Sequence, residues 1–333
     1  MYSNIVVDVF NLYYRTKGHH KEKTLDPITL ANEVIDVIEN DLGKYQDRTK
    51  PMYLLFDPIP KKDFGIDAAF KHSTRRQEIL PDYKINRRFN YCQGDLESIN
   101  LVRKYFSHRG EKIIEITSNE YEADDFVESL LEKLFENDKR AQVALVTTDN
   151  DWARYLSDNV VMLNDAFDKP FTSNDFLEKY NFVPTITSVT FFKAFFGDPS
   201  DNISGALMQK RLKKLNYIKK EGFDFIKEIA KNNEPIDDIL ERTSKYNLNI
   251  IKEHSKDHPA EKKFYFSIIA SDFKDAFDPI FNQNIAVIRS QCKDCQKYLK
   301  TKDVDEKYNN LIEEILKRKQ PEKQKFKFGK VKI

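Results

Sequence analysis

Short apolar runs alternate with longer helical patterns over the first two-thirds of the chain. These runs are brief and rich in aliphatic residues, which is the pattern of strands buried within a sheet. We predict strands over Asn4–Val9, Met52–Phe56, Lys112–Ile116 and Val143–Thr147, with a weaker fifth candidate over Val160–Leu163.

Between these runs, apolar residues recur at the spacing of one helix face. The stretch Pro27–Leu42 carries an apolar stripe and predicts a helix, and so do Leu96–Phe106 and Tyr121–Phe135. Strands that alternate with helices of this length favour an α/β fold. We therefore predict a mixed, mainly parallel sheet flanked by helices.

The pattern changes after about residue 170, where convincing strands stop and helical segments dominate. We place a boundary near residues 165–185. This divides the chain into an α/β domain over 1–180, a helical region over 181–316 and a tail over 317–333. The tail is Lys-rich and has no apolar face, so we expect it to be flexible and basic.

Composition narrows the class of protein. The chain has 333 residues, 33% of them charged, with a mean hydropathy of −0.65, which is typical of a charge-rich globular protein. Its 55 Lys and Arg nearly balance 54 Asp and Glu. This excludes a uniformly basic nucleic-acid coat but leaves local separation of charge open. Three cysteines are too few for a disulfide framework. Since no leader or apolar span is visible, we expect a cytoplasmic protein with no membrane contact.

Carboxylates gather where the predicted strands end. Ligands bind at the carboxyl ends of the strands in open α/β sheets, so these side chains are expected to meet at one edge. One such Asp alone is usually a helix cap or a turn residue. A converging set would repel strongly, and bound divalent cations would relieve that repulsion. Oxygen ligands without Cys or His favour Mg²⁺, with Mn²⁺ as a substitute. The set comprises Asp8, Asp57, Glu122, Asp124, Asp125, Asp149 and Asp151, joined by Asp198 and Asp201 from a turn-rich loop after an apolar helix over Phe191–Phe196.

The spacing of these acids favours two metal ions. Asp149 and Asp151 would face the same way in an extended segment. Glu122 and Asp125 would share a helix face, whereas Asp124 would join them only at an irregular first turn. Many acids shared by two ions about 4 Å apart are typical of a two-metal phosphodiester hydrolase.

A basic segment follows the second predicted strand. It interleaves Arg and Lys with aromatic residues, which suits phosphate binding and stacking on unpaired bases. A solvated helix face would explain the same charges, but the position directly after Asp57 favours substrate binding. The segment includes Phe70, Lys71, Arg75, Arg76, Tyr83, Lys84, Arg87, Arg88, Phe89, Tyr91, Arg103 and Lys104.

Six ordered blocks resemble the 5′ nuclease family, which includes flap endonucleases, phage ribonuclease H-type 5′–3′ exonucleases and the 5′ nuclease domain of bacterial DNA polymerase I. Six blocks in family order are specific, whereas one EADD would be weak. The blocks are VVDVFNLYYR (Val6–Arg15), LLFD (Leu54–Asp57), RRQEILPDYKINR (Arg75–Arg87), YEADD (Tyr121–Asp125), TTDNDWARYLSD (Thr147–Asp158) and GDPSDNISG (Gly197–Gly205).

The resemblance implies a PIN-like catalytic domain and a role for each matching residue. Lys84 resembles the basic residue that approaches the scissile phosphate from an arch, here at about residues 70–110. Asp125 and Asp198 match supporting acids. The implied first metal cluster is Asp8, Asp57, Glu122 and Asp124, and the second is Asp149, Asp151 and Asp201. The implied catalytic residues are Lys84, Asp8, Asp57 and Asp149, and the implied substrate-binding residues include Arg75, Arg76, Tyr83, Lys84 and Arg87.

One departure from the family pattern concerns the region after Gly205. The sequence ALMQKRLKKLNYIKKEG lacks the Gly-x-Gly of the expected hairpin between two helices, so we expect a diverged helix-hairpin-helix. Glycine permits close backbone approach, and without it binding to duplex DNA must differ. Positive charge compensates electrostatically, and we assign this role to Lys210, Arg211, Lys213 and Lys214.

The resemblance implies a metal-dependent 5′–3′ nuclease acting on flaps or nicks in DNA, and on RNA–DNA hybrids, in replication or repair. A monomer is expected, with a clamp or single-strand-binding protein as partner, in the nucleoid or, if phage-encoded, in the host cytoplasm. Two alternatives remain, a PIN-type ribonuclease and a non-catalytic DNA-binding accessory. The arch-like insert argues against the first, and the complete acid set argues against the second.

The CxxC formed by Cys292 and Cys295 is the remaining motif. A single pair without further ligands is too sparse for a zinc site, so we interpret it as structural.

Overall fold

The computed structural model describes residues 1–20, 25–58, 74–85, 93–109, 112–164, 167–205 and 280–300. Within these ranges a six-stranded sheet has the order β5-β4-β1-β2-β3-β8. Neighbouring strands are parallel except for β3 and β8, which pair antiparallel. This confirms the predicted mainly parallel sheet. The strands are β1 (Asn4–Asp8), β2 (Met52–Phe56), β3 (Ile113–Thr117), β4 (Val143–Val146), β5 (Val160–Leu163) and β8 (Leu299–Lys300).

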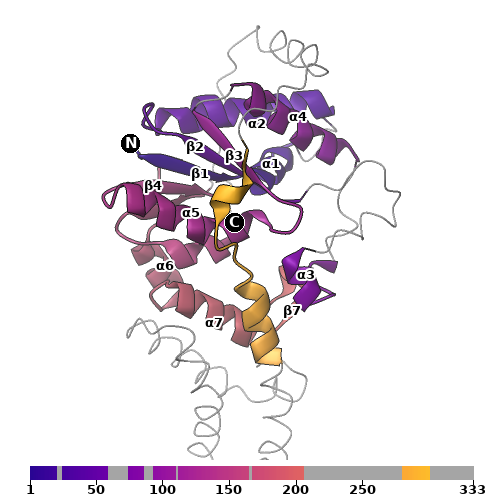
Figure 1. Cartoon of the computed structure of the whole chain (residues 1–333), viewed down its shortest axis with the longest axis vertical. Coiled ribbons are helices and arrows are strands. Elements are labelled where there is room, and N and C mark those ends of the chain that lie inside the picture. Colours follow the sequence, from indigo (N-terminus) through magenta and orange to yellow (C-terminus); the bar gives the residue numbers. More distant parts are fainter. Residues whose placement is uncertain are drawn as a thin grey trace, which may run out of the picture.

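Helices cover both faces of the sheet (Figure 1). Residues of β1 alternate between two cores, because successive side chains of a strand point to opposite faces. Ile5 and Val7 join one core, and Val6 joins the other. The first core includes α1 (Val9–Gly18), α2 (Pro27–Asp36) and α4 (Gln93–Arg109); the second includes α5 (Ala123–Asn137), α6 (Ser173–Tyr180) and α7 (Ile186–Phe196).

The helix predicted over Pro27–Leu42 changes its form along its length. The regular helix α2 ends at Asp36 and continues as a π-helical turn, η1 (Val37–Asp41), and a 3₁₀ turn, η2 (Leu42–Lys44). Ile38 and Leu42 are buried in the same core as α2. The apolar stripe therefore predicted the buried path, but not the widening of the helix.

Strands do not stop at residue 170, which corrects the prediction. A two-residue pair, β6 (Gly197–Asp198) and β7 (Ile203–Ser204), forms a hairpin around the 3₁₀ turn η6 (Pro199–Asp201). β8 lies still later in the chain. Strands of two residues are too short to show the alternation on which a sequence-based prediction depends.

The C-terminal segment, residues 280–300, returns to the main sheet. It is helical over 280–288, beside α7 and β7, and then crosses to β3, where it adds β8 (Figure 1). Its cysteines, Cys292 and Cys295, are buried and carry free thiols. The division into domains at 180 and 316 stays a prediction, because residues 206–279 and 301–333 lie outside the described ranges. Among the described helices, none is long and apolar enough to cross a membrane.

Candidate metal centre

The acids converge at the switch point of the sheet. From β1 the strand order runs outward to β2 and β3 on one side, and to β4 and β5 on the other. Ligands bind where the order of parallel strands reverses, which is the crevice between β1 and β4. Asp8 ends β1 and also caps α1, because its Oδ1 accepts a hydrogen bond from the Asn11 backbone N–H at 3.0 Å. Asp149 lies three residues after the end of β4, on the other side of this crevice.

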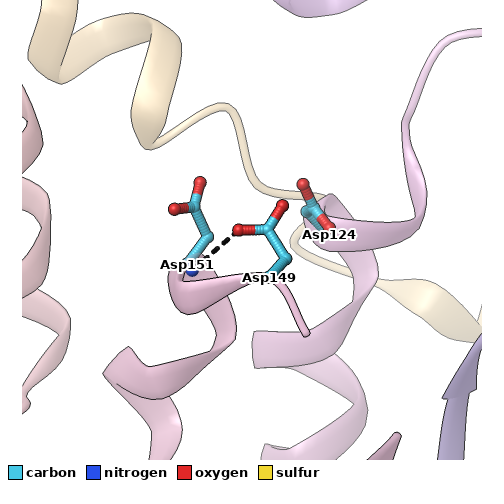
Figure 2. A group of neighbouring side chains, drawn as sticks. All are labelled: Asp124, Asp149 and Asp151. Atoms are coloured by element: carbon cyan, nitrogen blue, oxygen red, sulfur yellow. Dashed lines mark hydrogen bonds between the residues drawn. The ribbon is translucent and has the colours of Figure 1, made fainter. Parts of the chain in front are cut away.

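Three carboxylates from two elements form a first group of potential ligands (Figure 2). Asp124 lies in the first turn of α5, while Asp149 caps the 3₁₀ helix η5 (Asn150–Tyr155), which contains Asp151. One oxygen of each lies within 4.8 Å of the others. Asp149 Oδ1 accepts from the Asp151 backbone N–H at 3.0 Å, and Trp152 Nε1 donates to Asp124 Oδ1 at 2.6 Å. Asp149 and Asp151 are therefore brought together by a capped 3₁₀ turn, not by the extended segment that we predicted.

A second group shares one member with the first. Asp151, Asp198 and Asp201 also have carboxylate oxygens within 4.8 Å of one another. The hairpin of β6 and β7 supplies Asp198 and Asp201, and its base depends on glycine. Gly197 has φ +78°, and a Cβ on it would lie 2.3 Å from the Gly205 backbone nitrogen. The glycines of GDPSDNISG thus allow two backbone segments to touch and present the intervening acids.

The remaining predicted ligands lie beside α5. Asp57 Oδ1 accepts a hydrogen bond from the Ala123 backbone N–H at 2.8 Å. Glu122, the N-cap residue of α5, lies 2.6 Å from Lys84 Nζ through its Oε2. Glu122 and Asp125 are linked by a capping box, in which Asp125 Oδ2 accepts from the Glu122 backbone N–H at 3.0 Å. The other oxygen of Asp125, Oδ1, accepts from Arg76 Nη2 at 2.7 Å.

Four buried or largely buried cations lie against the acids. Arg76 is 1% exposed and also donates to the Tyr83 hydroxyl at 2.9 Å. That hydroxyl lies 3.1 Å from Glu122 Oε2. The other cations are Lys84 on Glu122, Arg154 on Asp151, and Lys193, which contacts both Asp151 and Asp198. A buried charge is tolerated only when it is paired, so these cations stabilise the acid cluster from within the protein.

Burial and crowding raise the pKa of several of these carboxyls. Burial is the largest cause for Asp149, followed by the nearby charge of Asp151, and its pKa is raised to about 7. Burial likewise raises the pKa of Asp57 to about 6 and that of Asp8 well above its ordinary value. Asp198 differs: burial opposes its charge, but Lys193 outweighs this and lowers the pKa to about 2. The site therefore favours added positive charge.

The donor set fits a hard divalent cation. The two groups found among the described residues consist only of carboxylates, which suit Mg²⁺ or Mn²⁺ rather than zinc. A bound cation would lower these raised pKa values, because its charge stabilises the ionised carboxylates. We therefore interpret this edge of the sheet as a candidate metal centre.

The predicted substrate-binding residues have different surroundings. Arg75 is exposed at the start of α3 (Arg75–Ile79), where it pairs with Glu78 at 3.4 Å. Arg76 and Tyr83 are buried beneath the acids, so in this structure neither side chain reaches the surface. Lys84 is partly buried with its ammonium among the acids. Arg87, Lys210, Arg211, Lys213 and Lys214 lie outside the described residues.

Sequence reasoning missed three residues that contact the acids. Arg154 and Trp152 lie within a recognised block, but nothing in the pattern indicated that they contact Asp151 and Asp124. Lys193 did carry a signal. It is the one charged residue in FFKAFF (Phe191–Phe196), an apolar run that was predicted to be helical. A lone Lys on such a helix needs a buried partner.

Comparisons with known proteins point to one family. A family model described as the 5'-3' exonuclease N-terminal resolvase-like domain matches residues 5–181. The 5'-3' exonuclease of Aquifex aeolicus is 28% identical over 185 residues, which are 55% of this chain and 60% of that protein. The flap endonuclease of Escherichia phage T5 is 27% identical over 262 residues, 75% of this chain and 79% of the relative. The 5'-3' exonuclease of Buchnera aphidicola is 30% identical over 255 residues, 76% of this chain and 81% of the relative.

Solved structures show the same fold. A bacteriophage T5 flap endonuclease, in a pseudo-enzyme–product complex with DNA and metal ions, superposes with a TM-score of 0.57 at 19% identity. The match covers 95% of this chain and 97% of that one. The T5 protein co-crystallised with metal ions gives a TM-score of 0.55, also at 19% identity. The predicted PIN-like α/β fold is therefore confirmed.

Proposed function

Because the chain belongs to the 5'-3' exonuclease family, whose N-terminal domain it contains at residues 5–181, we propose that it is a metal-dependent 5′–3′ nuclease acting on DNA. Its substrates are the 5′ ends of flaps and nicked duplexes, and RNA–DNA hybrids, in replication or repair. The observation that carries the proposal is the pair of carboxylate groups that share Asp151 at the switch point of the sheet.

Two Mg²⁺ ions are the proposed cofactors, and Mn²⁺ would substitute for them. When bound, such ions supply an activated water and stabilise the leaving oxygen of a phosphodiester. The described acids divide naturally into holders of a first ion, around Asp124 and Asp149, and of a second, around Asp198 and Asp201. Asp151 belongs to both groups, which favours two ions close together.

The protein residues bind and orient the substrate phosphate. Lys84 Nζ lies beside Glu122 at the rim of the acids, and its side chain is 16% exposed. Burial lowers the pKa of Lys84, but the neighbouring acids, Glu122 foremost, raise it further, so the net shift is upward and the ammonium stays charged. A charged donor in this position would stabilise the negative charge that develops on the phosphate during cleavage. Arg76 and Tyr83 orient the acids from beneath.

The proposal is tested with end-labelled substrates and matched variants. The full chain is incubated with a 5′-flap duplex, a nicked duplex, an RNA–DNA hybrid and single-stranded RNA, with Mg²⁺ or with EDTA. We expect Mg²⁺-dependent cleavage near the 5′ end of the flap and nicked substrates. Asp149→Ala should abolish it, because a group of three potential ligands loses one member. Asp158→Ala is the control, since Asp158 is an exposed turn residue in the same block.

The outcomes also separate the alternatives. Cleavage of single-stranded RNA alone would indicate a PIN-type ribonuclease. Binding of DNA without any cleavage would indicate a non-catalytic accessory. If Asp149→Ala cleaved DNA as fast as the unaltered protein, the assignment of the acids would be wrong.

A further inference from the structure

Lys193 has an unusual place in the fold. It lies in the last turn of α7 between buried neighbours, Phe191 and Ala194, and is itself only 8% exposed. Its Nζ contacts Asp151 Oδ1 and lies 2.6 Å from Asp198 Oδ2. The ammonium therefore contacts two of the three carboxylates of the second group.

This position has an energetic reason. An isolated ammonium taken out of water is costly, so Lys193 requires its carboxylate partners. The partners equally require a cation, because Asp151, Asp198 and Asp201 have oxygens within 4.8 Å of one another. The C-terminal end of a helix also favours positive charge. The positive charge of Lys193 and the negative charges of its carboxylate partners thus compensate each other without any added ion.

The first group is different. Asp149 and Asp124 have no lysine contact within the described part of the chain, and Arg76 approaches Asp124 only to 3.7 Å. A cation binding to the first group would meet two carboxylates without direct lysine pairing, Asp124 and Asp149, and a third, Asp151, that contacts Lys193. A cation binding to the second group would meet oxygens that already contact an ammonium.

We propose that Lys193 is a built-in counter-ion of the second carboxylate group, which holds Asp151 and Asp198 in the metal-free protein and is displaced when a divalent cation binds there. The inference rests on the proposed metal-dependent function. It assigns Lys193 a positioning role: the lysine keeps the second group assembled, and it lowers the affinity of that group for metal relative to the first. Two like charges competing for the same carboxylate oxygens repel strongly in a buried site.

The direct test is the binding of Mn²⁺ to the full chain. Binding is measured by isothermal titration calorimetry and by the electron paramagnetic resonance signal of free Mn²⁺. The variant is Lys193→Met, since methionine keeps an unbranched stem and fills the same apolar space. The control is Lys133→Met, which removes a lysine from an exposed pair with Glu136 on α5. We expect Lys193→Met to bind the more weakly held of the two Mn²⁺ ions at least about tenfold more tightly, because a competing charge is lost. The more tightly held Mn²⁺ should change less, because Lys193 contacts only Asp151 of the first group, and the control should be unchanged.

Thermal denaturation supplies a second readout that does not depend on activity. In EDTA, Lys193→Met should melt at a lower temperature than the unaltered protein, because two buried carboxylates lose their counter-ion. Saturating Mn²⁺ should remove most of that difference. If the variant stayed equally destabilised with Mn²⁺, or bound the second ion more weakly, the lysine would be a fixed part of the loaded site and the inference would be wrong.

A measurement on the unaltered protein keeps the inference testable if the Lys193→Met variant does not fold. Acetylation of lysines by acetic anhydride, read by mass spectrometry, should increase severalfold at Lys193 on Mn²⁺ loading, because a released amine reacts faster than a paired one. Lys133 is the internal reference. Unchanged labelling with two Mn²⁺ ions bound would overturn this inference and leave the proposed metal-dependent function standing. If the unaltered protein bound no Mn²⁺ at all, the inference and the metal dependence of the proposed function would both fail.

Discussion

At the scale of single residues, Lys84 is held in an unusual backbone conformation. Its φ of +52° lies in the left-handed region, which costs a residue with a side chain about 1–2 kcal/mol. Two contacts hold it there: its N–H donates to the Asp201 carbonyl at 2.9 Å, and Nζ lies 2.6 Å from Glu122. The chain therefore tolerates strain to place an ammonium at the acids, which favours a functional role over a solvated surface lysine.

Replacing this ammonium should slow cleavage far more than it alters the fold. For Lys84→Met we expect the cleavage rate on a 5′-flap substrate to fall about 10²-fold or more, because a charged donor to the phosphate is lost. Lys44→Met serves as the control, since Lys44 pairs with Asp41 on the surface at 2.9 Å. Single-turnover kinetics gives the rate, and circular dichroism checks the fold. A rate within about twofold of the unaltered protein would exclude Lys84 from the chemistry.

The acids could be found from the sequence, but their partners could not. Asp8 and Asp149 were recognisable because each follows a buried strand, and the ends of parallel strands meet at one edge. Arg76 was predicted to bind substrate, yet it pairs with Asp125, 49 residues away. Spacing along a chain carries no information on such pairs, because they depend on how distant elements pack.

At the scale of elements, the hairpin of β6 and β7 is tied to the C-terminal segment. Asn284 is 3% exposed, and its Nδ2 donates to the Ala194 carbonyl at 3.1 Å and to the Ser204 carbonyl at 2.8 Å. It thereby joins the end of α7 to β7 across some 80 residues of sequence. Further along the segment, the Cys292 N–H donates to the Asp125 carbonyl at 2.7 Å. The segment thus contacts the hairpin and α5, two of the elements that carry acids.

Asn284→Ala tests this connection. Two buried carbonyls would lose their donor, so we expect the free energy of unfolding to fall by about 1–3 kcal/mol. Hydrogen exchange should increase over residues 197–204, since the hairpin loses its link to α7. Gln283→Ala is a suitable control, because Gln283 is an adjacent residue whose hydrogen bond to Ile79 is exposed. Equal exchange in both variants would show that the hairpin holds its own shape.

Strands that form a compact apolar run were predictable, and strands of two residues were not. The strands Met52–Phe56 and Val160–Leu163 have the predicted bounds, because each is a compact apolar run with all or most of its residues buried. The helix predicted over Tyr121–Phe135 begins two residues later, at Ala123, and Glu122 is its N-cap residue. Boundaries therefore limit what spacing rules can predict about a site.

At the scale of the whole molecule, near-neutral net charge conceals a strongly charged interior. Nine candidate acids face four buried cations, so the described site has a formal charge of −5 before any divalent ion binds. Two divalent ions would reduce this to −1. Such a site would destabilise the metal-free protein wherever its acids are ionised, and metal binding would reverse the effect.

The pH dependence of stability follows from the direction of the pKa shifts. The carboxyls of Asp149 and Asp57 have folded pKa values of about 7 and about 6, above their ordinary value of 3.8. Between pH 3.8 and these folded pKa values, the folded protein therefore binds more protons than the unfolded chain. The stabilising contribution is complete below pH 3.8 and is lost as pH rises through the folded pKa values, by up to about 1.4 kcal/mol per pH unit for each group.

In EDTA the melting temperature should consequently fall between about pH 4 and about pH 7. The increase caused by Mg²⁺ should grow over the same range, because a cation competes with protons for the same oxygens. Asp149→Asn removes one titrating group and should make the EDTA profile flatter, whereas Asp158→Ala, a surface control, should leave it unchanged. A melting temperature in EDTA that rose across this range would mean that Lys84 and Lys193 already keep the acids ionised. Mg²⁺ would then stabilise the protein equally at both ends of the range.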